Sequence, residues 1–264
     1  MKLKLDYING KHFGEYWAVV EKFYHSKFMS DEYPRHLINF LKSTGAKNII
    51  DASCGIGEPS LKLIEQGFSI DCSDGNKEML EICKRKASEK KLSAHIFHSK
   101  WQDLPSKVNK MYDAVLCLDS SITYINMWGK EHTTINIKSA HLNILKSVKA
   151  FYKILKNNGI VIIGLAKYAF SNKEEFICDF GEKYIENTKV RHIWKINWDL
   201  STKTKYWELI FYFNNKSYTR KLQSYMLMPD ELTEILKKNG FSNIKIVEIE
   251  PKEYDQNFMA RKIK

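Results

Sequence analysis

The ten residues 48–57, with the sequence NIIDASCGIG, constrain the fold of this chain more than any other segment. A short apolar run ends in Asp51 and continues through small residues to a Gly-x-Gly pair, and residues 59–66 are expected to form a helix. A second acid, Asp74, follows the next apolar run. Glycines let a backbone approach a ligand closely, and an acid at the tip of a second strand accepts hydrogen bonds from ribose hydroxyls. The pattern therefore predicts a nucleoside-binding strand–turn–helix–strand unit.

The same segment resembles the first motif of class I S-adenosylmethionine-dependent methyltransferases, which reads hydrophobic-hydrophobic-Asp/Glu-x-x-x-Gly-x-Gly. Ile49 and Ile50 match the apolar pair, Asp51 the acid, and Gly55 and Gly57 the glycines. The resemblance implies that S-adenosylmethionine is the cofactor and S-adenosyl-L-homocysteine the product. It also implies a set of cofactor contacts along the strand ends, namely Asp51, Ser53, Gly55, Gly57, Asp74, Gly75, Leu118 and Ser121.

Binding of a dinucleotide pyrophosphate is the alternative for such a glycine turn. That fingerprint needs Gly-x-Gly-x-x-Gly with a helix N-terminus facing phosphate. Ser60 stands at the third glycine position, and Glu58 would place negative charge beside the phosphates. S-adenosylmethionine carries a sulfonium cation and no phosphate, so acids near the turn are tolerable. The methyltransferase interpretation is therefore preferred.

The net charge of +11 raises the question of nucleic-acid binding. Only five of the 42 basic residues are arginines, whereas readers of bases and phosphates rely on the planar fork of Arg. The lysines are spread over what we expect to be solvated helix faces, for example residues 84–91 and 146–156. The charge is therefore interpreted as compositional bias, and a nucleic-acid partner is not expected.

Five cysteines, an odd number, occur without the spacing of metal ligands. Neither a disulfide framework nor a zinc site is expected, and a reducing cytoplasm is the predicted location. The N-terminus lacks a basic-then-apolar signal pattern, and no apolar run approaches the length needed to span a bilayer. No membrane association is expected.

Hydrophobic periodicity predicts an α/β fold in which a seven-stranded, doubly wound, Rossmann-like methyltransferase sheet follows N-terminal helices. The helices of residues 12–42 should break near Ser30. The expected later helices are residues 76–90, 139–155 and 229–239, and Asp74 is a candidate cap for the first of them. The expected strands are residues 48–52, 68–72, 95–98, 112–118, 160–165, 244–249 and 258–263.

Between the fifth strand and the last helix, the pattern changes to alternating polar and aromatic residues. Residues 189–198, 206–213 and 218–226 are expected to be antiparallel strands inserted into the fold. The 264 residues suffice for one domain with its own core. Within it we expect a helical cap (residues 1–45), a cofactor-binding core (46–168), an antiparallel substrate-side insertion (169–228) and a C-terminal helix with the last strands (229–264).

Within the superfamily, the chain is most similar to the glycine/sarcosine N-methyltransferases and the related sugar N-methyltransferases. Residues 5–10 followed by Trp17 match that group's N-terminal Asp-x-Tyr-x-x-Gly…Trp segment, and the fourth strand, 112–118, resembles its Phe-Asp-Ala-Val-Ile-Cys-Leu. The resemblance implies that Tyr7 and Trp17 contact the cofactor. Trp101 matches the adenine-side Trp, and because Lys100 replaces the usual acceptor, adenine contacts are assigned to Trp101 and Gln102.

Departures from that group bear on the substrate. Ala166 stands where the glycine enzymes carry an Arg that clamps the substrate carboxylate, and Ser120 replaces an Asn. Asp119 adds a carboxylate in place of a small residue, which suits a cationic or amine-bearing substrate. Glycine and sarcosine are therefore not the expected substrates.

Methyl transfer needs orientation and exclusion of water more than covalent help from the protein. A group that accepts a proton from an ammonium substrate is still useful, and Asp119, Tyr24 and Tyr124 are the catalytic candidates. The lone histidines His12 and His25 are the weaker choices. Residues assigned to the substrate side are Tyr33, Ser120, Tyr168, Trp194, Arg220 and Tyr225.

The leading hypothesis is an N-methyltransferase for a small-molecule amine, and an O-methyltransferase for a sugar or secondary metabolite is the near alternative. An RNA or protein methyltransferase is disfavoured, because the fourth strand ends in Leu118-Asp119-Ser120-Ser121 and not in the Asn/Asp-Pro-Pro-Tyr/Phe motif that clamps a flipped base. No metal is expected, since clustered acid and His ligands are lacking. The N-terminal helices could close the site within one chain or reach a neighbour, so homo-oligomerisation is left open.

Overall fold

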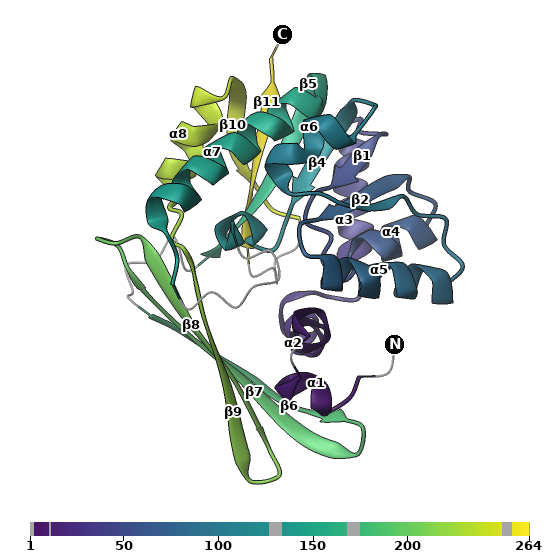
Figure 1. Cartoon of the computed structure of the whole chain (residues 1–264). Coiled ribbons are helices and arrows are strands. Elements are labelled where there is room, and N and C mark those ends of the chain that lie inside the picture. The colour runs from purple at the N-terminus through teal and green to yellow at the C-terminus, as the bar shows by residue number, and fades with distance from the viewer. Residues whose placement is uncertain (1–2, 11, 127–133, 168–174, 250–254, 264) are drawn as a thin grey trace.

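A seven-stranded sheet with the order β10-β11-β5-β4-β1-β2-β3 forms the centre of the protein in the computed structural model (Figure 1). The structure describes residues 3–10, 12–126, 134–167, 175–249 and 255–263. The first five strands are parallel, and β11 and then β10 add antiparallel edges. The prediction of a seven-stranded doubly wound sheet is confirmed. The strands are β1 Ile49–Asp51, β2 Ile70–Asp74, β3 Ile96–His98, β4 Tyr112–Cys117, β5 Leu155–Ala166, β10 Phe241–Val247 and β11 Asp255–Lys262.

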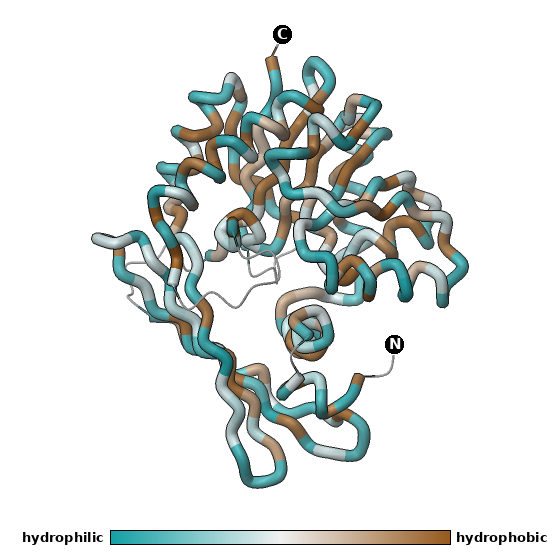
Figure 2. Tube along the Cα trace, in the orientation of Figure 1, coloured by the Kyte–Doolittle hydropathy of each residue, from teal (hydrophilic) through white to brown (hydrophobic). Residues whose placement is uncertain are grey.

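Alternating side chains of the central strands supply two separate cores. Ile49 and Leu116 pack under α3 Tyr33–Ser43, α4 Ser60–Glu65 and α5 Lys77–Glu89. Their neighbours in sequence, such as Ile50, pack on the opposite face of the sheet. That face is covered by α6 Leu104–Lys107, α7 Ile137–Ile154 and α8 Pro229–Lys238. Burial of both faces explains why these strands read as continuous apolar runs, which Figure 2 shows as brown segments through the centre.

A second sheet of four antiparallel strands lies below the first in Figure 1. It consists of β6 Glu175–Ile185, β7 Thr188–Asp199, β8 Thr204–Phe213 and β9 Lys216–Tyr225. The prediction of an antiparallel insertion after the fifth strand is confirmed, and the expected runs correspond to the last three of these strands, whereas β6 was not predicted. The strand β6 escaped notice because its pairing with β7 shifts register between Asp179 and Glu182, which interrupts the alternation expected of a strand.

The helix α2 Phe13–Phe28 lies between the two sheets, and the short α1 Asp6–Asn9 precedes it (Figure 1). Tyr16 and Phe23, which are buried on α2, meet Phe211 of β8 edge-on, with ring centroids 5.8 and 5.9 Å from that of Phe211. On the other side, Gly14 lies against α5: a Cβ at this position would sit 2.8 Å from the Glu78 backbone. The helix therefore joins the inserted sheet to the central one.

Element boundaries differ from expectation in two informative places. The side chain of Asn76, not Asp74, caps α5 by accepting a hydrogen bond from the Met79 N–H at 3.1 Å. Helix α7 continues directly into β5, which begins at Leu155 and not at the expected residue 160. Asn158 there adopts a φ of 64°, within a register shift between β4 and β5.

Three further features concern the helices, the cysteines and the possible metal ligands of the described residues. None of the helices in these ranges combines the length and apolar character needed to cross a membrane. All five cysteines are buried and free, each lying within the described ranges. Within the same ranges, no group of three or more His, Cys, Asp or Glu side chains is arranged to hold a metal ion.

Candidate active site

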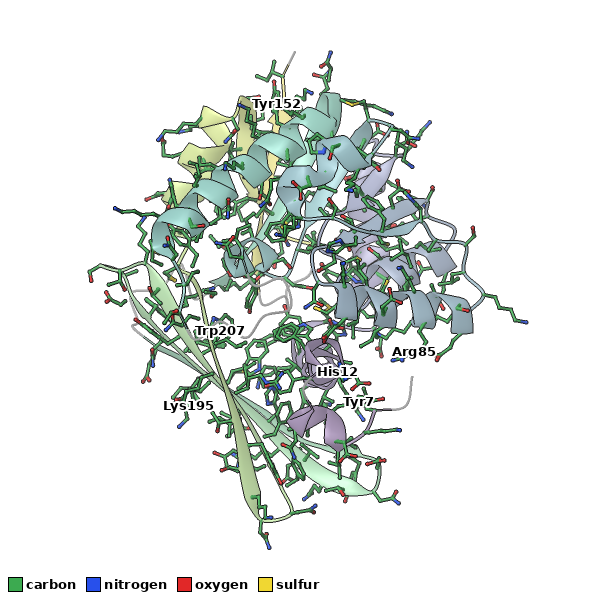
Figure 3. The ribbon with its side chains drawn as sticks, in the orientation of Figure 1. Tyr7, His12, Arg85, Tyr152, Lys195 and Trp207 are labelled. Atoms are coloured by element: carbon green, nitrogen blue, oxygen red, sulfur yellow. The ribbon has the colours of Figure 1, made fainter. Side chains whose placement is uncertain are left out.

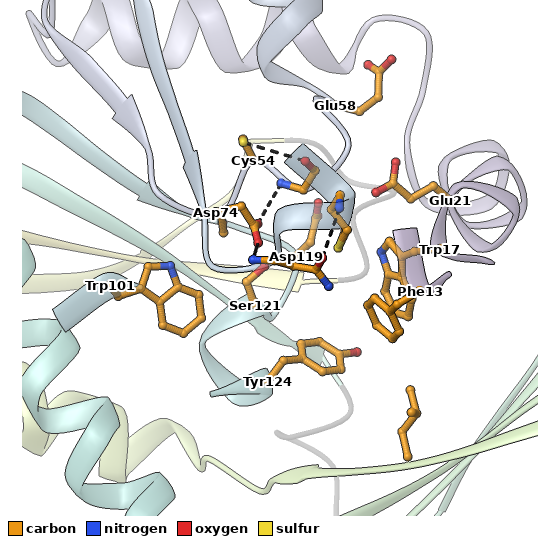
Figure 4. A pocket seen from close by; sticks show the side chains of 15 residues that line it. Phe13, Trp17, Glu21, Cys54, Glu58, Asp74, Trp101, Asp119, Ser121 and Tyr124 are labelled. Carbon is orange, nitrogen blue, oxygen red and sulfur yellow. Dashed lines mark hydrogen bonds between the residues drawn. The ribbon is translucent and has the colours of Figure 1, made fainter. Parts of the chain in front are cut away.

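A cavity opens where the carboxyl ends of β1, β2 and β4 meet α2, and it holds about 770 Å³ of empty space including open solvent (Figure 4). Carboxyl ends of parallel strands at such a point are the usual ligand site of open α/β sheets. The residues that line it come from the strand ends, α2, α5, η1 Trp101–Asp103, η2 Ser121–Tyr124 and β9. They are Phe13, Trp17, Glu21, Ser53, Cys54, Gly55, Glu58, Asp74, Asn76, Met79, Trp101, Asp119, Ser121, Tyr124 and Leu222.

The glycine turn forms the floor of this cavity. Gly55 and Gly57 have φ values of 51° and 105°, in the left-handed region that favours glycine. A Cβ at Gly57 would lie 2.6 Å from Leu61 Cδ1 and 3.0 Å from Cys83 Sγ. The turn thus needs glycine both for its conformation and for its packing, which explains the motif.

Asp51 is buried beneath the turn and does not line the cavity. Its carboxylate accepts hydrogen bonds from the Ser53 N–H at 3.0 Å and the Ser60 hydroxyl at 2.6 Å. Burial raises the pKa of Asp51 to about 6. Ser53 in turn accepts a hydrogen bond from the Leu118 N–H at 3.2 Å, which ties the end of β4 to the turn. Asp51 therefore organises the floor from below.

Asp74, at the end of β2, does face the cavity. Its two carboxylate oxygens accept hydrogen bonds from the Gly55 N–H at 3.0 Å and the Asn76 N–H at 2.8 Å. Burial raises the pKa of Asp74 to about 6. Each carboxylate oxygen can accept a second bond, so ribose hydroxyls remain acceptable partners.

Trp101 lines the cavity on the same side as Asp74 (Figure 4). Its indole N–H donates to the Ala52 carbonyl at 2.6 Å, and its ring meets Phe151 edge-on at 6.3 Å. The side chain is 3% exposed, so it serves the core as well as the cavity wall. Gln102, assigned with it to adenine, does not line the cavity.

A strained turn after β4 brings Asp119 into the wall. Asp119 and Ser120 adopt φ values of 54° and 53°, which non-glycine residues rarely adopt. Asp255 of β11 accepts hydrogen bonds from both the backbone N–H and the hydroxyl of Ser120. The hydroxyl of Tyr24 on α2 donates to Asp119 Oδ1 at 3.3 Å. The structure thus brings together two of the three predicted catalytic residues, and Tyr124 lines the same cavity.

The cavity is acidic although the chain carries a net charge of +11. Glu21, Glu58, Asp74 and Asp119 all line it, and none of the lining residues that the structure describes is basic. Burial raises the pKa of Glu21 well above its ordinary value, and the nearby Glu58 and Asp119 carboxylates add to the shift. Such a site favours a ligand that brings positive charge.

Several predicted cofactor residues support the walls and do not line the cavity. Gly57 and Leu118 lie in the turns described above, and the Gly75 carbonyl lies 3.0 Å from His98 Nε2. Tyr7 on α1 packs, partly buried, against the main core. The predicted residues that do line the cavity are Trp17, Ser53, Gly55, Asp74, Trp101 and Ser121.

None of the described residues assigned to the substrate side lines the cavity, and packing explains why. Trp194 stacks on Tyr24, with ring centroids 5.7 Å apart. Arg220 donates to the Gly10 carbonyl at 3.0 Å and covers the ring of Tyr16. The other three are also held away from the cavity. Tyr225 donates a hydrogen bond to Glu231 at 2.6 Å, the Ser120 hydroxyl donates to Asp255, and Tyr33 lines a separate hollow beside Pro59. Tyr168 lies outside the described residues.

The sequence analysis did not predict seven of the lining residues, and the sequence features that could have identified them differ. Glu58 directly follows the turn, so its position beside Gly57 could have suggested it, but its charge was used only as an argument against phosphate binding. Phe13 and Glu21 each lie four residues from Trp17 on one helix, so helical periodicity from Trp17 could have suggested them. Cys54 lies between the predicted Ser53 and Gly55, so the turn itself could have suggested it. The remaining three, Asn76, Met79 and Leu222, face the cavity through tertiary packing.

Residues 49–159 match a family model described as a methyltransferase domain. This segment of the chain is thus similar to a methyltransferase domain. The matched segment begins at β1 and ends within β5. It therefore includes the glycine turn, Asp74 and Asp119, which are the parts of the cavity that the strand ends supply.

Known proteins with similar domains agree with this assignment. A glycine/sarcosine N-methyltransferase from Aphanothece halophytica is 30% identical over 171 residues, which are 65% of this chain and 58% of the relative. The chain thus matches only somewhat more than half of that relative's length. The resemblance to this group that the N-terminal and fourth-strand motifs indicated is confirmed for the methyltransferase domain.

Solved structures extend the likeness to nearly the whole chain. An amino pentose methyltransferase from Micromonospora echinaspora, solved with S-adenosylmethionine bound, has a TM-score of 0.74 at 13% identity, covering 92% of this chain and 96% of that one. An S-adenosylmethionine-dependent methyltransferase from Clostridium acetobutylicum gives 0.70 at 16% identity, with coverage of 94% and 99%. These TM-scores show a shared fold that extends over nearly the whole chain.

Proposed function

We propose that this protein transfers a methyl group from S-adenosylmethionine to the nitrogen of a small-molecule amine. The observation that carries the proposal is the acidic cavity at the ends of β1, β2 and β4 in a methyltransferase domain. The names of the glycine/sarcosine relative and of the amino pentose enzyme, both of which act on amine compounds, support the same class of acceptor.

The lining residues fit S-adenosylmethionine. Asp74 has carboxylate oxygens for ribose hydroxyls, and Trp101 offers an apolar surface on the same side for a base. S-adenosylmethionine carries positive charge on its ammonium and sulfonium groups and negative charge only on its α-carboxylate. This net positive charge suits a wall of acids that has no basic side chain among its described residues. A phosphate ligand would meet repulsion here.

The same charge pattern limits the acceptor. A zwitterionic amino acid would need a cation for its carboxylate, and the position that holds Arg in the glycine enzymes is the buried Ala166. An amine without a neighbouring carboxylate would instead be attracted by Asp119 and Glu58. We therefore place the acceptor among cationic amines, such as amino sugars, and not among simple amino acids.

The chain's own residues would orient the reactants and accept a proton. S-adenosylmethionine, when bound, supplies the activated methyl group. Asp119, held by the Tyr24 hydroxyl at 3.3 Å, is placed to take a proton from an ammonium acceptor, so that its nitrogen regains a lone pair. Phe13 and Trp17, stacked with centroids 5.6 Å apart, would exclude water from one side of the cavity.

Following a labelled methyl group tests this proposal. The protein is incubated with methyl-labelled S-adenosylmethionine and host extract divided into metabolites, RNA and protein, with Asp74→Asn as the matched control. We expect label in a cationic metabolite that binds to a cation-exchange resin, and much less label with the variant. Label in RNA or protein, or only in neutral O-methylated metabolites, would contradict the proposal.

A further inference from the structure

Glu21 is the least explained of the acids that line the cavity. It lies on α2, and its Oε1 is 3.6 Å from the position that a Cβ would take on Gly55. Its Oε2 is buried and has no hydrogen-bond partner within the described ranges. His25 Nε2 lies 4.0 Å from this oxygen, beyond hydrogen-bond distance. A buried carboxylate oxygen without a donor is costly, and a ligand that brings one would remove that cost.

The groups around Glu21 do not neutralise it. On its own helix, burial lowers the pKa of His25 to about 3, so this imidazole is neutral. Glu58 before α4 and Asp119 after β4 add negative charge, and Cys83 on α5 also raises the pKa of Glu21. Lys86 on α5 acts in the opposite direction but does not outweigh burial. The carboxyl group therefore tends to hold a proton until a cation arrives.

Asp74 and Glu21 flank the glycine turn from opposite sides (Figure 4). Asp74 accepts the Gly55 N–H, whereas Glu21 lies over the Gly55 Cα. A ligand whose ribose meets Asp74 and whose base lies toward Trp101 must extend its other end across Gly55. In S-adenosylmethionine that other end carries an ammonium group, a donor of three hydrogen bonds.

We propose that Glu21 binds the α-ammonium group of S-adenosylmethionine. This inference rests on the proposed function, because it assumes that S-adenosylmethionine is the cofactor. Its consequence is a proton linkage: the cation stabilises the ionised carboxylate, so binding releases the proton that Glu21 holds, and it passes to the buffer. Cofactor affinity then rises with pH until the pKa of Glu21 in the empty cavity is passed.

Isothermal titration calorimetry with three related ligands tests the assignment without any acceptor. S-adenosylmethionine, S-adenosylhomocysteine and sinefungin share the α-ammonium group, whereas only the first and third carry positive charge at or near the sulfur position. We expect Glu21→Gln to weaken all three by a similar factor, about 10- to 100-fold. Titrations in buffers of different ionisation enthalpy should show proton release by the wild type that is reduced in the variant.

The matched control is Glu81→Gln on α5, a change of the same kind at a side chain that is 70% exposed and paired with Lys84. It should bind all three ligands as the wild type does, and thermal unfolding should confirm that both variants are folded. Selective loss of S-adenosylmethionine and sinefungin would place Glu21 at the sulfur and overturn the inference. Unchanged affinities would also overturn it. Failure of the wild type to bind any of the three would contradict the proposed function itself.

Discussion

The two sheets of this protein border one cavity, but they contribute to it unequally. The central sheet and its connecting turns supply the glycine turn, Asp74 and Asp119, whereas the four-stranded sheet supplies only Leu222 among the described lining residues. Aromatic residues of the inserted sheet such as Phe211 and Trp194 instead pack against α2, the helix that carries Trp17 and Glu21. An inserted sheet can thus shape a site by holding a helix in place.

The inner face of the inserted sheet has the character of a core. His192 is fully buried, and its ring stacks on Phe211 with centroids 3.9 Å apart. The Trp194 indole N–H donates to His192 Nε2 at 2.7 Å, while His192 Nδ1 lies 2.9 Å from the Ile210 carbonyl. This places the imidazole proton on Nδ1, and burial lowers the pKa of His192 to about 3. The residue is therefore a neutral structural group and not a catalytic base.

The largest effect is expected from removing a buried side chain on the inner face of the inserted sheet. Trp207, which lies between the sheets in Figure 3, is 1% exposed, and its indole N–H donates to Ser224 at 2.8 Å. Trp207→Ala should lower the free energy of unfolding by about 3–5 kcal/mol, measured by urea denaturation. Tyr206→Ala, at a neighbouring residue that is 39% exposed, should cost less than about 1 kcal/mol. Equal costs would mean that the inner face is not a core.

The glycine turn of the central sheet should give the next largest effect. Gly57→Ala adds a Cβ that meets Leu61 and Cys83, whereas Gly67→Ala, at a φ of 85°, meets nothing within 4 Å. Both changes carry backbone strain, so their difference isolates packing. We expect Gly57→Ala to be about 1–3 kcal/mol more destabilising than Gly67→Ala in urea unfolding. A difference near zero would show that the turn relaxes easily.

The contrast between the two sheets also shows what sequence can predict. The turn and Asp74 could be found because a few adjacent residues fix them: left-handed φ values require Gly55 and Gly57, and the acid follows the next apolar run. Leu222 faces the cavity because distant segments dock against each other. No local pattern marks such a position. Trp194 and Arg220 were assigned to the substrate side and do not line the cavity for the same reason. An alternating strand pattern does not reveal which partner each face of the sheet covers.

Substitutions in the two sheets should differ in their effect on ligand affinity, and this effect should be of intermediate size. Asp74→Asn should weaken binding of S-adenosylhomocysteine by about 10- to 100-fold, whereas Tyr225→Phe in the inserted sheet should leave it unchanged, both measured by calorimetry. Burial raises the pKa of Asp74 to about 6. The ionised carboxylate, the better acceptor, is lost as the pH falls through that value, so wild-type affinity should decrease from pH 7 to pH 5. A pH-independent affinity would remove Asp74 from the ribose site.

The smallest expected effect lies where the two regions meet. Tyr24 stacks on Trp194 of the inserted sheet and donates its hydroxyl to Asp119 after β4, so it is the residue through which α2 touches both. Tyr24→Phe keeps the stacked ring and removes only the hydrogen bond. A double-mutant cycle with Asp119→Ala, which removes the acceptor, should give a coupling of about 0.5–1.5 kcal/mol in urea unfolding. Additive costs would mean that the Tyr24 hydroxyl contributes no coupling between α2 and the Asp119 turn.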